Sequence, residues 1–159
     1  MKKQIIKIYT DGASSGNPGK AGWGVVFIKD GKEFEIGGRS DHATNNQMEL
    51  TAPIEALKHL KQITLQDNPM GSGVEIVSDS KYVILGITEW IFNWQKNNWR
   101  SASKKPVLNR VLWEELFMLN QEFKPKWTYV EGHNGDKHNE RADVIATSFG
   151  YGEPVKLKK

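Results

Sequence analysis

The segment GWGVVFIKDGKEFEIGG, residues 22–38, decides the start of the fold. Both halves are rich in β-branched and aromatic residues, and Asp30-Gly31 between them is a strong signal for a two-residue hairpin turn. We therefore expect antiparallel strands at Gly22–Ile28 and Glu33–Gly38. Upstream, residues 4–10 alternate and are rich in Ile and Tyr, which predicts a first strand that pairs with this hairpin.

The residues that follow the hairpin predict a long helix. Thr44-x-x-Gln47 and Asn46-x-x-Glu49 both resemble capping boxes, and apolar residues then recur at helical spacing. Pro53 removes a backbone hydrogen bond inside this helix, so we expect a kink there.

The rest of the chain predicts alternating strands and helices. We expect a loop at 66–73, a buried strand at 74–78, two short helices broken at Gly86 and near Asn97-Asn98, a strand at 127–130 and a helix at 137–149. The helix after Pro106 should place five apolar residues on one face: Leu108, Leu112, Leu116, Leu119 and Phe123. This order predicts an α/β fold, with a five-stranded mixed sheet of three antiparallel N-terminal strands and then parallel strands, flanked by helices.

Length and composition favour one soluble domain. The chain has 159 residues, and we expect a single domain at 1–150 followed by a polar, basic, frayed tail at 151–159. The absence of cysteine excludes disulfides, thiolate catalysis and cysteine zinc sites, and it fits the reducing cytoplasm. No apolar run approaches the roughly 20 residues that span a bilayer, so no membrane contact is expected.

The positive charge is concentrated in one segment. The net charge is +3, yet residues 90–113 contain five basic residues and no acid, so the remainder is slightly acidic. Such a segment is either a phosphate-binding element or a solvated helix face.

Four acids occupy positions where a metal site could form. Asp11 is expected to end the first strand, Asp79 to follow the strand at 74–78, Glu49 to lie early in the long helix, and Asp143 in the last helix. If the first and fourth strands are parallel neighbours, Asp11 and Asp79 meet at the carboxyl end of the sheet. Taken one at a time, each acid could instead be a turn former, a capping residue or a solvated side chain.

Clustered carboxylates repel one another unless a cation is present. Hard oxygen ligands select Mg²⁺ or Mn²⁺, and two such ions about 4 Å apart can activate water and stabilise the leaving oxygen of a phosphodiester.

Four separated segments resemble the signatures of bacterial type 1 ribonuclease H, in the right order. They are YTDGASSGNPGKAGWG (9–24), TNNQMELTAPIEAL (44–57), VSDSKYV (77–83) and GHNGDKHNERAD (132–143). The resemblance implies a ribonuclease H-like fold and an endonuclease that hydrolyses the RNA strand of RNA–DNA hybrids. It also implies a two-metal-ion mechanism that leaves 5′-phosphate and 3′-hydroxyl ends.

The resemblance also implies roles for individual residues. Asp11, Glu49, Asp79 and Asp143 would be the catalytic metal ligands, and His133 would assist proton transfer or product release. His42, His59 and His138 match no catalytic position, and we expect them to be surface residues.

The family's substrate contacts also have counterparts here. Asn17, Thr44 and Asn109 match residues that bind a DNA phosphate, while Asn45 and Asn46 match residues that read the minor groove, including RNA 2′-hydroxyls; helix capping is the alternative role. Residues 88–105 resemble the family's basic protrusion, in which we expect the tryptophans to pack together more than to stack on bases. The residues of this protrusion expected to bind substrate are Trp90, Lys96, Trp99, Arg100, Lys104 and Lys105.

The sequence departs from the family in places. Lys81 stands where a glutamine is usual, and Gln95, Asn97 and Asn98 make the protrusion less basic, which predicts weaker hybrid binding. The fold alone is also compatible with two other functions: a DNA nuclease or integrase of the same superfamily, and an inactive hybrid-binding module. Nothing suggests an obligate dimer, so we expect a monomer.

Overall fold

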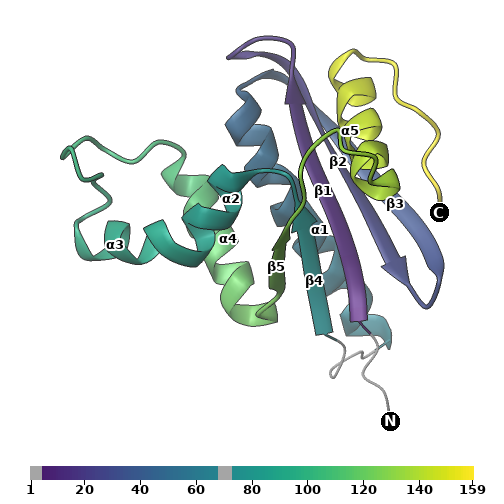
Figure 1. Ribbon diagram of the computed structural model, residues 1–159, viewed down its shortest axis with the longest axis horizontal. Coiled ribbons are helices and arrows are strands. Elements are labelled where there is room, and N and C mark those ends of the chain that lie inside the picture. Colours follow the sequence, from purple (N-terminus) through teal and green to yellow (C-terminus); the bar gives the residue numbers. More distant parts are fainter. Residues whose placement is uncertain (1–4, 68–72) are drawn as a thin grey trace.

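A central sheet organises the molecule, and Figure 1 shows it in the computed structural model, which describes residues 5–67 and 73–159. The strand order is β3-β2-β1-β4-β5; β1 pairs antiparallel with β2 and parallel with β4. The predicted five-stranded mixed sheet is therefore confirmed. Along the chain the elements are β1 (Ile5–Ser14), β2 (Gly19–Lys29), β3 (Lys32–Ala43), α1 (Asn45–Asp67), β4 (Gly73–Ser78), α2 (Lys81–Leu85), η1 (Gly86–Trp90), α3 (Ile91–Lys96), α4 (Arg110–Phe123), β5 (Lys126–Tyr129) and α5 (Lys137–Gly150).

The hairpin of β2 and β3 has the predicted two-residue turn. Asp30 and Gly31 both have positive φ, 53° and 74°, as a type I′ turn requires. All three hairpin strands are longer than expected, because backbone pairing continues past the apolar runs that the sequence displays. The expectation that Asp11 ends the first strand was consequently wrong: Asp11 pairs with Gly24, and β1 continues to Ser14.

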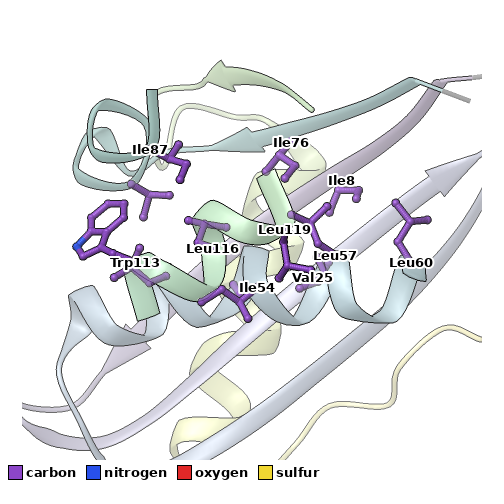
Figure 2. Close-up of a cluster of buried hydrophobic side chains, with 14 of the residues drawn as sticks. Ile8, Val25, Ile54, Leu57, Leu60, Ile76, Ile87, Trp113, Leu116 and Leu119 are labelled. Carbon is purple, nitrogen blue, oxygen red and sulfur yellow. The ribbon is translucent and has the colours of Figure 1, made fainter. Parts of the chain in front are cut away.

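Helices cover both faces of the sheet with separate apolar cores. On one face, β-strand residues such as Ile8 and Val25 pack against α1, and α4 packs against α1. Figure 2 shows Ile8 and Val25 in one cluster with Ile54, Leu57 and Leu116. On the other face, α5 packs against β1, β2 and β3. The core of that second face contains Tyr9, Val26, Val77, Ala142 and Ile145.

Helix α1 begins with the first of the two predicted capping boxes. The Gln47 backbone N–H donates to Thr44 Oγ1 at 3.1 Å, and the Thr44 N–H donates to Gln47 Oε1 at 2.8 Å. The helix continues through Pro53 to Asp67. The start of the predicted loop at 66–73 was therefore wrong, and residues 68–72 of that loop lie outside the described residues. The kink at Pro53 stays a prediction.

The helical region after β4 differs from expectation at Gly86. Helices α2 and α3 are joined by the π-helical segment η1 and form one run, so Gly86 does not break a helix. A Cβ at Gly86 would overlap the ring of Trp113, so this glycine permits close packing instead. The helical run ends at Asn97, where the predicted break near Asn97-Asn98 is confirmed.

The apolar face of α4 is shorter than predicted. The helix starts at Arg110, and Asn109 before it has φ 63°, which turns the chain and leaves Leu108 78% exposed. Trp113, which the predicted face omitted, is fully buried.

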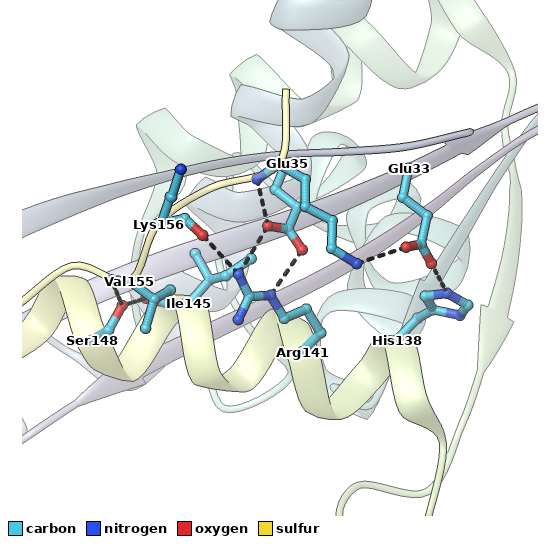
Figure 3. A network of polar contacts seen from close by, with 9 residues as sticks. Glu33, Glu35, His138, Arg141, Ile145, Ser148, Val155 and Lys156 are labelled. Atoms are coloured by element: carbon cyan, nitrogen blue, oxygen red, sulfur yellow. Dashed lines mark hydrogen bonds and ion pairs between the residues drawn. The ribbon is translucent and has the colours of Figure 1, made fainter.

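The C-terminal tail is docked, which contradicts the expectation of fraying. Val155 and Leu157 pack against the α5-side core, and the Glu35 N–H donates to the Lys158 carbonyl at 2.8 Å. Figure 3 shows two further contacts of the tail, from Arg141 to the Lys156 carbonyl and from the Val155 N–H to Ser148. The alternation Val155-Lys156-Leu157-Lys158 is the sequence signal that would have indicated this. Within residues 5–67 and 73–159, no helix is long and apolar enough to cross a membrane.

Candidate active site

Three acids from distant parts of the chain form a carboxylate cluster, which we define as Asp11, Glu49 and Asp79. One oxygen of each lies within 4.8 Å of the others. The parallel register of β1 and β4 ends at Thr10↔Ser78, so the residues that follow this pair, Asp11 and Asp79, lie at the same edge of the sheet. The predicted meeting of Asp11 and Asp79 is confirmed, and α1 adds Glu49.

The approach of Glu49 depends on a glycine. Gly12 follows Asp11 in β1, and a Cβ there would overlap the Glu49 backbone nitrogen and the Met48 backbone. Helix α1 can therefore lie directly against β1, which brings the Glu49 carboxylate to the end of the strand pair. Sequence reasoning placed Gly12 in a motif but assigned it no role.

The carboxylate cluster is short of positive charge. Burial raises the pKa of Asp11 to about 8, with further contributions from the charges of Asp79 and Asp143. Burial, together with Asp11 and Asp79, holds the pKa of Glu49 well above its ordinary value. Among the ion pairs of the described residues, none involves these acids.

The donor set fits a hard divalent cation. Glu49 Oε2 is buried and has no hydrogen-bond partner among the described residues, which is costly for a carboxylate oxygen without a cation. Asp143 is outside the group of three, but its charge acts on Asp11, so α5 brings it beside the cluster. Oxygen ligands of this kind are those that Mg²⁺, Ca²⁺ and Mn²⁺ prefer.

Asn139 is a site residue that the sequence analysis missed. Its side chain is 2% exposed, and Nδ2 donates to Asp79 Oδ2 at 3.3 Å. Asn139 lies in the first turn of α5, whose N-cap is Asp136. Its position within the quoted GHNGDKHNERAD motif was the signal available.

The four histidines occupy different environments. His133 is exposed in the loop before α5, with φ 58°, and this loop passes against Asp79, because a Cβ at Gly132 would lie 2.8 Å from Asp79 Oδ2. His42 is exposed as expected. His59 and His138 also reach the surface, but both are half-buried.

His59 and His138 are covered for different reasons. His59 packs against Phe27 and Phe34, with ring centroids 5.5 and 6.2 Å away. His138 Nε2 lies 2.5 Å from Glu33 Oε1, and its ring centroid lies 5.1 Å from that of Tyr9.

The polar residues expected to bind substrate gather mainly at the start of α1. The Asn45 N–H donates to Asn17 Oδ1 at 2.9 Å, which ties the turn after β1 to this helix. Thr44 belongs to the capping box, and Asn46 is exposed. Asn109 immediately precedes α4, where its Nδ2 donates to Tyr82 Oη at 3.2 Å.

The protrusion has an aromatic interior and basic side chains outside. Trp94 has ring centroids 6.1 Å from both Trp90 and Trp99 and 5.2 Å from Trp113. Trp99 is 9% exposed, whereas Trp90 is 38% exposed. The expectation that these tryptophans pack together is confirmed. The basic residues expected at this surface are all exposed: Lys96, Arg100, Lys104 and Lys105.

The fold and the carboxylate cluster define an α/β enzyme that places a cation site at the carboxyl ends of neighbouring strands. The RNase H family profile matches residues 3–149. A ribonuclease H from Thermosynechococcus vestitus is 49% identical over 155 residues, which cover 97% of this chain and 94% of the relative. The ribonuclease H of a Cyanothece species is 45% identical over 160 residues, with coverage of 100% and 98%.

Solved structures agree with these sequence matches. LC9-RNase H1, a type 1 RNase H, superposes with a TM-score of 0.78 at 25% identity and covers 96% of this chain and 75% of the neighbour. LC11-RNase H1, solved in complex with an RNA/DNA hybrid, gives a TM-score of 0.66 at 28% identity, with coverage of 90% and 94%. The chain belongs to the ribonuclease H family. It is accordingly a metal-dependent nuclease, and Asp11, Glu49 and Asp79 form an acid cluster that could hold a metal ion.

Proposed function

We propose that this protein is an endoribonuclease that hydrolyses the RNA strand of RNA–DNA hybrids. The convergence of Asp11, Glu49 and Asp79 in a chain of this family is the observation that carries the proposal. The relative LC11-RNase H1 was solved with such a hybrid, which supports this substrate class.

The proposed cofactor is Mg²⁺, with Mn²⁺ as a substitute. Asp11, Glu49, Asp79 and Asp143 would hold two ions with substrate bound. The unpartnered Oε2 of Glu49 and the raised pKa of Asp11 support this assignment, since a cation would stabilise both charged carboxylates. When bound, the ions supply stabilisation of the negative charge that builds up on a scissile phosphate.

The side chains around the cluster would direct hydrolysis of the phosphodiester. A water oxygen forms a bond to phosphorus, the bond to the 3′-oxygen breaks, and a proton reaches that oxygen, so the ends are a 5′-phosphate and a 3′-hydroxyl. Asn139 orients Asp79 by its amide hydrogen bond. His133, exposed in the loop beside Asp79, assists proton transfer or product release.

The substrate would be held on both sides of the cluster. We propose that Asn17, Thr44 and Asn109 bind a DNA phosphate and that Asn45 and Asn46 read the minor groove. The 2′-hydroxyl there distinguishes RNA from DNA. The exposed basic side chains of the protrusion, Lys96, Arg100, Lys104 and Lys105, would bind backbone phosphates beside the exposed Trp90. The buried Trp99 would contribute to this proposed surface by packing beneath it.

We also propose that the protein acts as a monomer in the cytoplasm. The lack of cysteine supports a reducing compartment. Sedimentation analysis of the purified chain would test the monomer.

A labelled substrate assay tests the proposed function. A hybrid with a 5′-labelled RNA strand should be cut internally with Mg²⁺ and left intact with excess EDTA, while duplex DNA of the same sequence should not be cut. The RNA fragments should be extended by a polymerase, which requires a 3′-hydroxyl. Cleavage undiminished by EDTA contradicts the metal assignment, equal cutting of duplex DNA contradicts the substrate, and a gel shift without turnover in either metal indicates a binding module.

A further inference from the structure

We propose that Lys81 binds a phosphate of the nucleic-acid substrate at the edge of the carboxylate cluster, an inference that rests on the proposed function. Lys81 lies two residues beyond Asp79, at the carboxyl end of β4. Its Nζ lies 5.3 Å from the ring centroid of Tyr129, the last residue of β5. Ser78 pairs with Tyr129 in the sheet register, so the lysine and the ring lie at the end of the sheet where the acids converge.

Lys81 has a charge that no acid in the described chain neutralises. The side chain is exposed and belongs to none of the ion pairs of residues 5–67 and 73–159, whereas Lys58 and Lys158 each bind a glutamate. Contact with an aromatic face leaves the ammonium charge and its N–H donors available. A phosphate oxygen is the acceptor that such a group binds best.

The position of Lys81 in its helix does not explain the lysine. Lys81 is the first residue of α2, where a positive charge opposes the helix dipole, and Ser80 already caps this helix by accepting from the Val83 N–H at 3.2 Å. The helix dipole therefore disfavours the lysine, and its contact with the ring of Tyr129 offsets part of that cost. A benefit in substrate binding accounts for a cation at this point.

The surrounding charges give that benefit a physical basis. A polyanionic substrate must approach the carboxylate cluster, whose own charge repels it. A cation at the rim offsets this repulsion for a phosphate that flanks the scissile bond. Tyr129 is 43% exposed, so its ring and Lys81 present one continuous surface at that rim. Tyr129 is accordingly a positioning residue that acts through the lysine.

Steady-state cleavage of a hybrid with Mg²⁺, over a series of KCl concentrations, tests the proposal. Lys81→Gln should raise KM roughly fivefold, keep kcat within twofold, and reduce the slope of log KM against log salt by about 0.9, the contribution of one phosphate contact. Lys126→Gln is the matched control, because Lys126 is an exposed lysine at the opposite end of β5. It should change neither KM nor the slope.

Variants of the ring separate positioning from folding. Tyr129→Phe keeps the aromatic face and should behave as the wild type, whereas Tyr129→Leu should raise KM by a smaller factor than Lys81→Gln. All variants should keep the wild-type urea midpoint.

Hybrids with single methylphosphonate linkages locate the contact. Neutralising one particular phosphate should raise KM for the wild type and have no effect on Lys81→Gln. The inference is overturned if Lys81→Gln matches Lys126→Gln, or if its KM rises without a change in salt slope. Failure of the wild type to cut any hybrid would instead overturn the proposed function.

Discussion

Acids are held in two opposite ways on this sheet. In the part of the chain that the structure describes, the carboxylate cluster has no basic side chain paired with it, whereas Glu33 and Glu35 of β3 each bind cations. We call the second group the ion-pair network and define it as Glu33, Glu35, His138, Arg141 and Lys158 (Figure 3).

The ion-pair network stabilises its charged carboxylates. Burial alone would raise the pKa of Glu35, whose side chain is 0% exposed, but the Arg141 guanidinium and the Lys158 N–H lower it. Arg141 binds bidentately, with Nε at 2.8 Å and Nη2 at 3.0 Å from the two carboxylate oxygens. Lys158 and then His138 lower the pKa of Glu33 to about 2. In this protein, burial of an acid therefore indicates a candidate site in the carboxylate cluster, where cationic partners are missing. It does not indicate one at Glu35, which is paired with Arg141.

The largest expected effect comes from removing one charge of the carboxylate cluster. Asp11→Asn should lower hybrid cleavage in Mg²⁺ by roughly a thousandfold or more, since several kcal/mol of charge stabilisation is lost. Circular dichroism should show an intact fold, because the substitution also relieves repulsion. Asp41→Asn, in an exposed ion pair, is the control and should cut normally. An Asp11→Asn protein that cuts at the wild-type rate would place the site elsewhere.

Breaking the ion-pair network should affect stability instead. Arg141→Met leaves Glu35 buried without its main cation and should lower the free energy of unfolding by about 3 kcal/mol in urea at pH 7. Arg39→Met removes only an exposed partner of Asp41 and should cost less than about 0.5 kcal/mol. Equal losses from the two variants would show that the network is no more than a surface feature.

The two groups should also give opposite pH dependence of stability in EDTA. The pKa of Asp11 rises from 3.8 to about 8 on folding, so between these values the folded state holds more protons and stability falls as pH rises. A change from 3.8 to about 8 corresponds to roughly 6 kcal/mol in total, so we expect a loss of several kcal/mol, which Asp11→Asn should reduce. The pKa of Glu33 is lowered from 4.5 to about 2, so its contribution is full above pH 4.5 and is lost as pH falls toward 2.

Urea unfolding at a series of pH values measures both slopes. Glu33→Gln should flatten only the acidic limb. If Asp11→Asn leaves the decline between pH 4 and 8 unchanged, the proton does not reside in the carboxylate cluster.

The smallest effects distinguish two histidines. His133→Ala should slow turnover about tenfold, less than loss of a fully limiting general acid or base, and should leave stability unchanged. His138→Ala should leave turnover unchanged and lower the free energy of unfolding by about 0.5–1 kcal/mol, since only a partly exposed pair with Glu33 is lost. Interchanged outcomes for the two variants would reverse these assignments.

Much of this fold can be predicted from the sequence, because turn and capping signals agree with the periodicity of apolar residues. The Asp30-Gly31 turn, the Thr44–Gln47 box and the apolar strand at 74–78 each specify an element without tertiary information. The exact strand ends could not be predicted, because backbone pairing of β1 with β2 continues beyond the residues in which apolar and polar side chains alternate.

Features that depend on contacts between distant segments were missed. From the sequence, Gly86 is interpreted as a helix breaker, because its close packing against Trp113 depends on a distant segment. The tail is interpreted as frayed for the same reason, since its partners, Glu35 and Arg141, lie far away in the sequence. The acids of the site were identifiable from their motifs, but the single hydrogen bond from Asn139 to Asp79 was not.

The missing side chain at Gly12 has a consequence for protein design. Grafting the three acids onto another scaffold of strands and a helix would reproduce their identities but not their spacing, because any larger residue after the first aspartate pushes the helix outward. A transplanted site that is to bind a divalent ion must therefore include the glycine as well as the three acids.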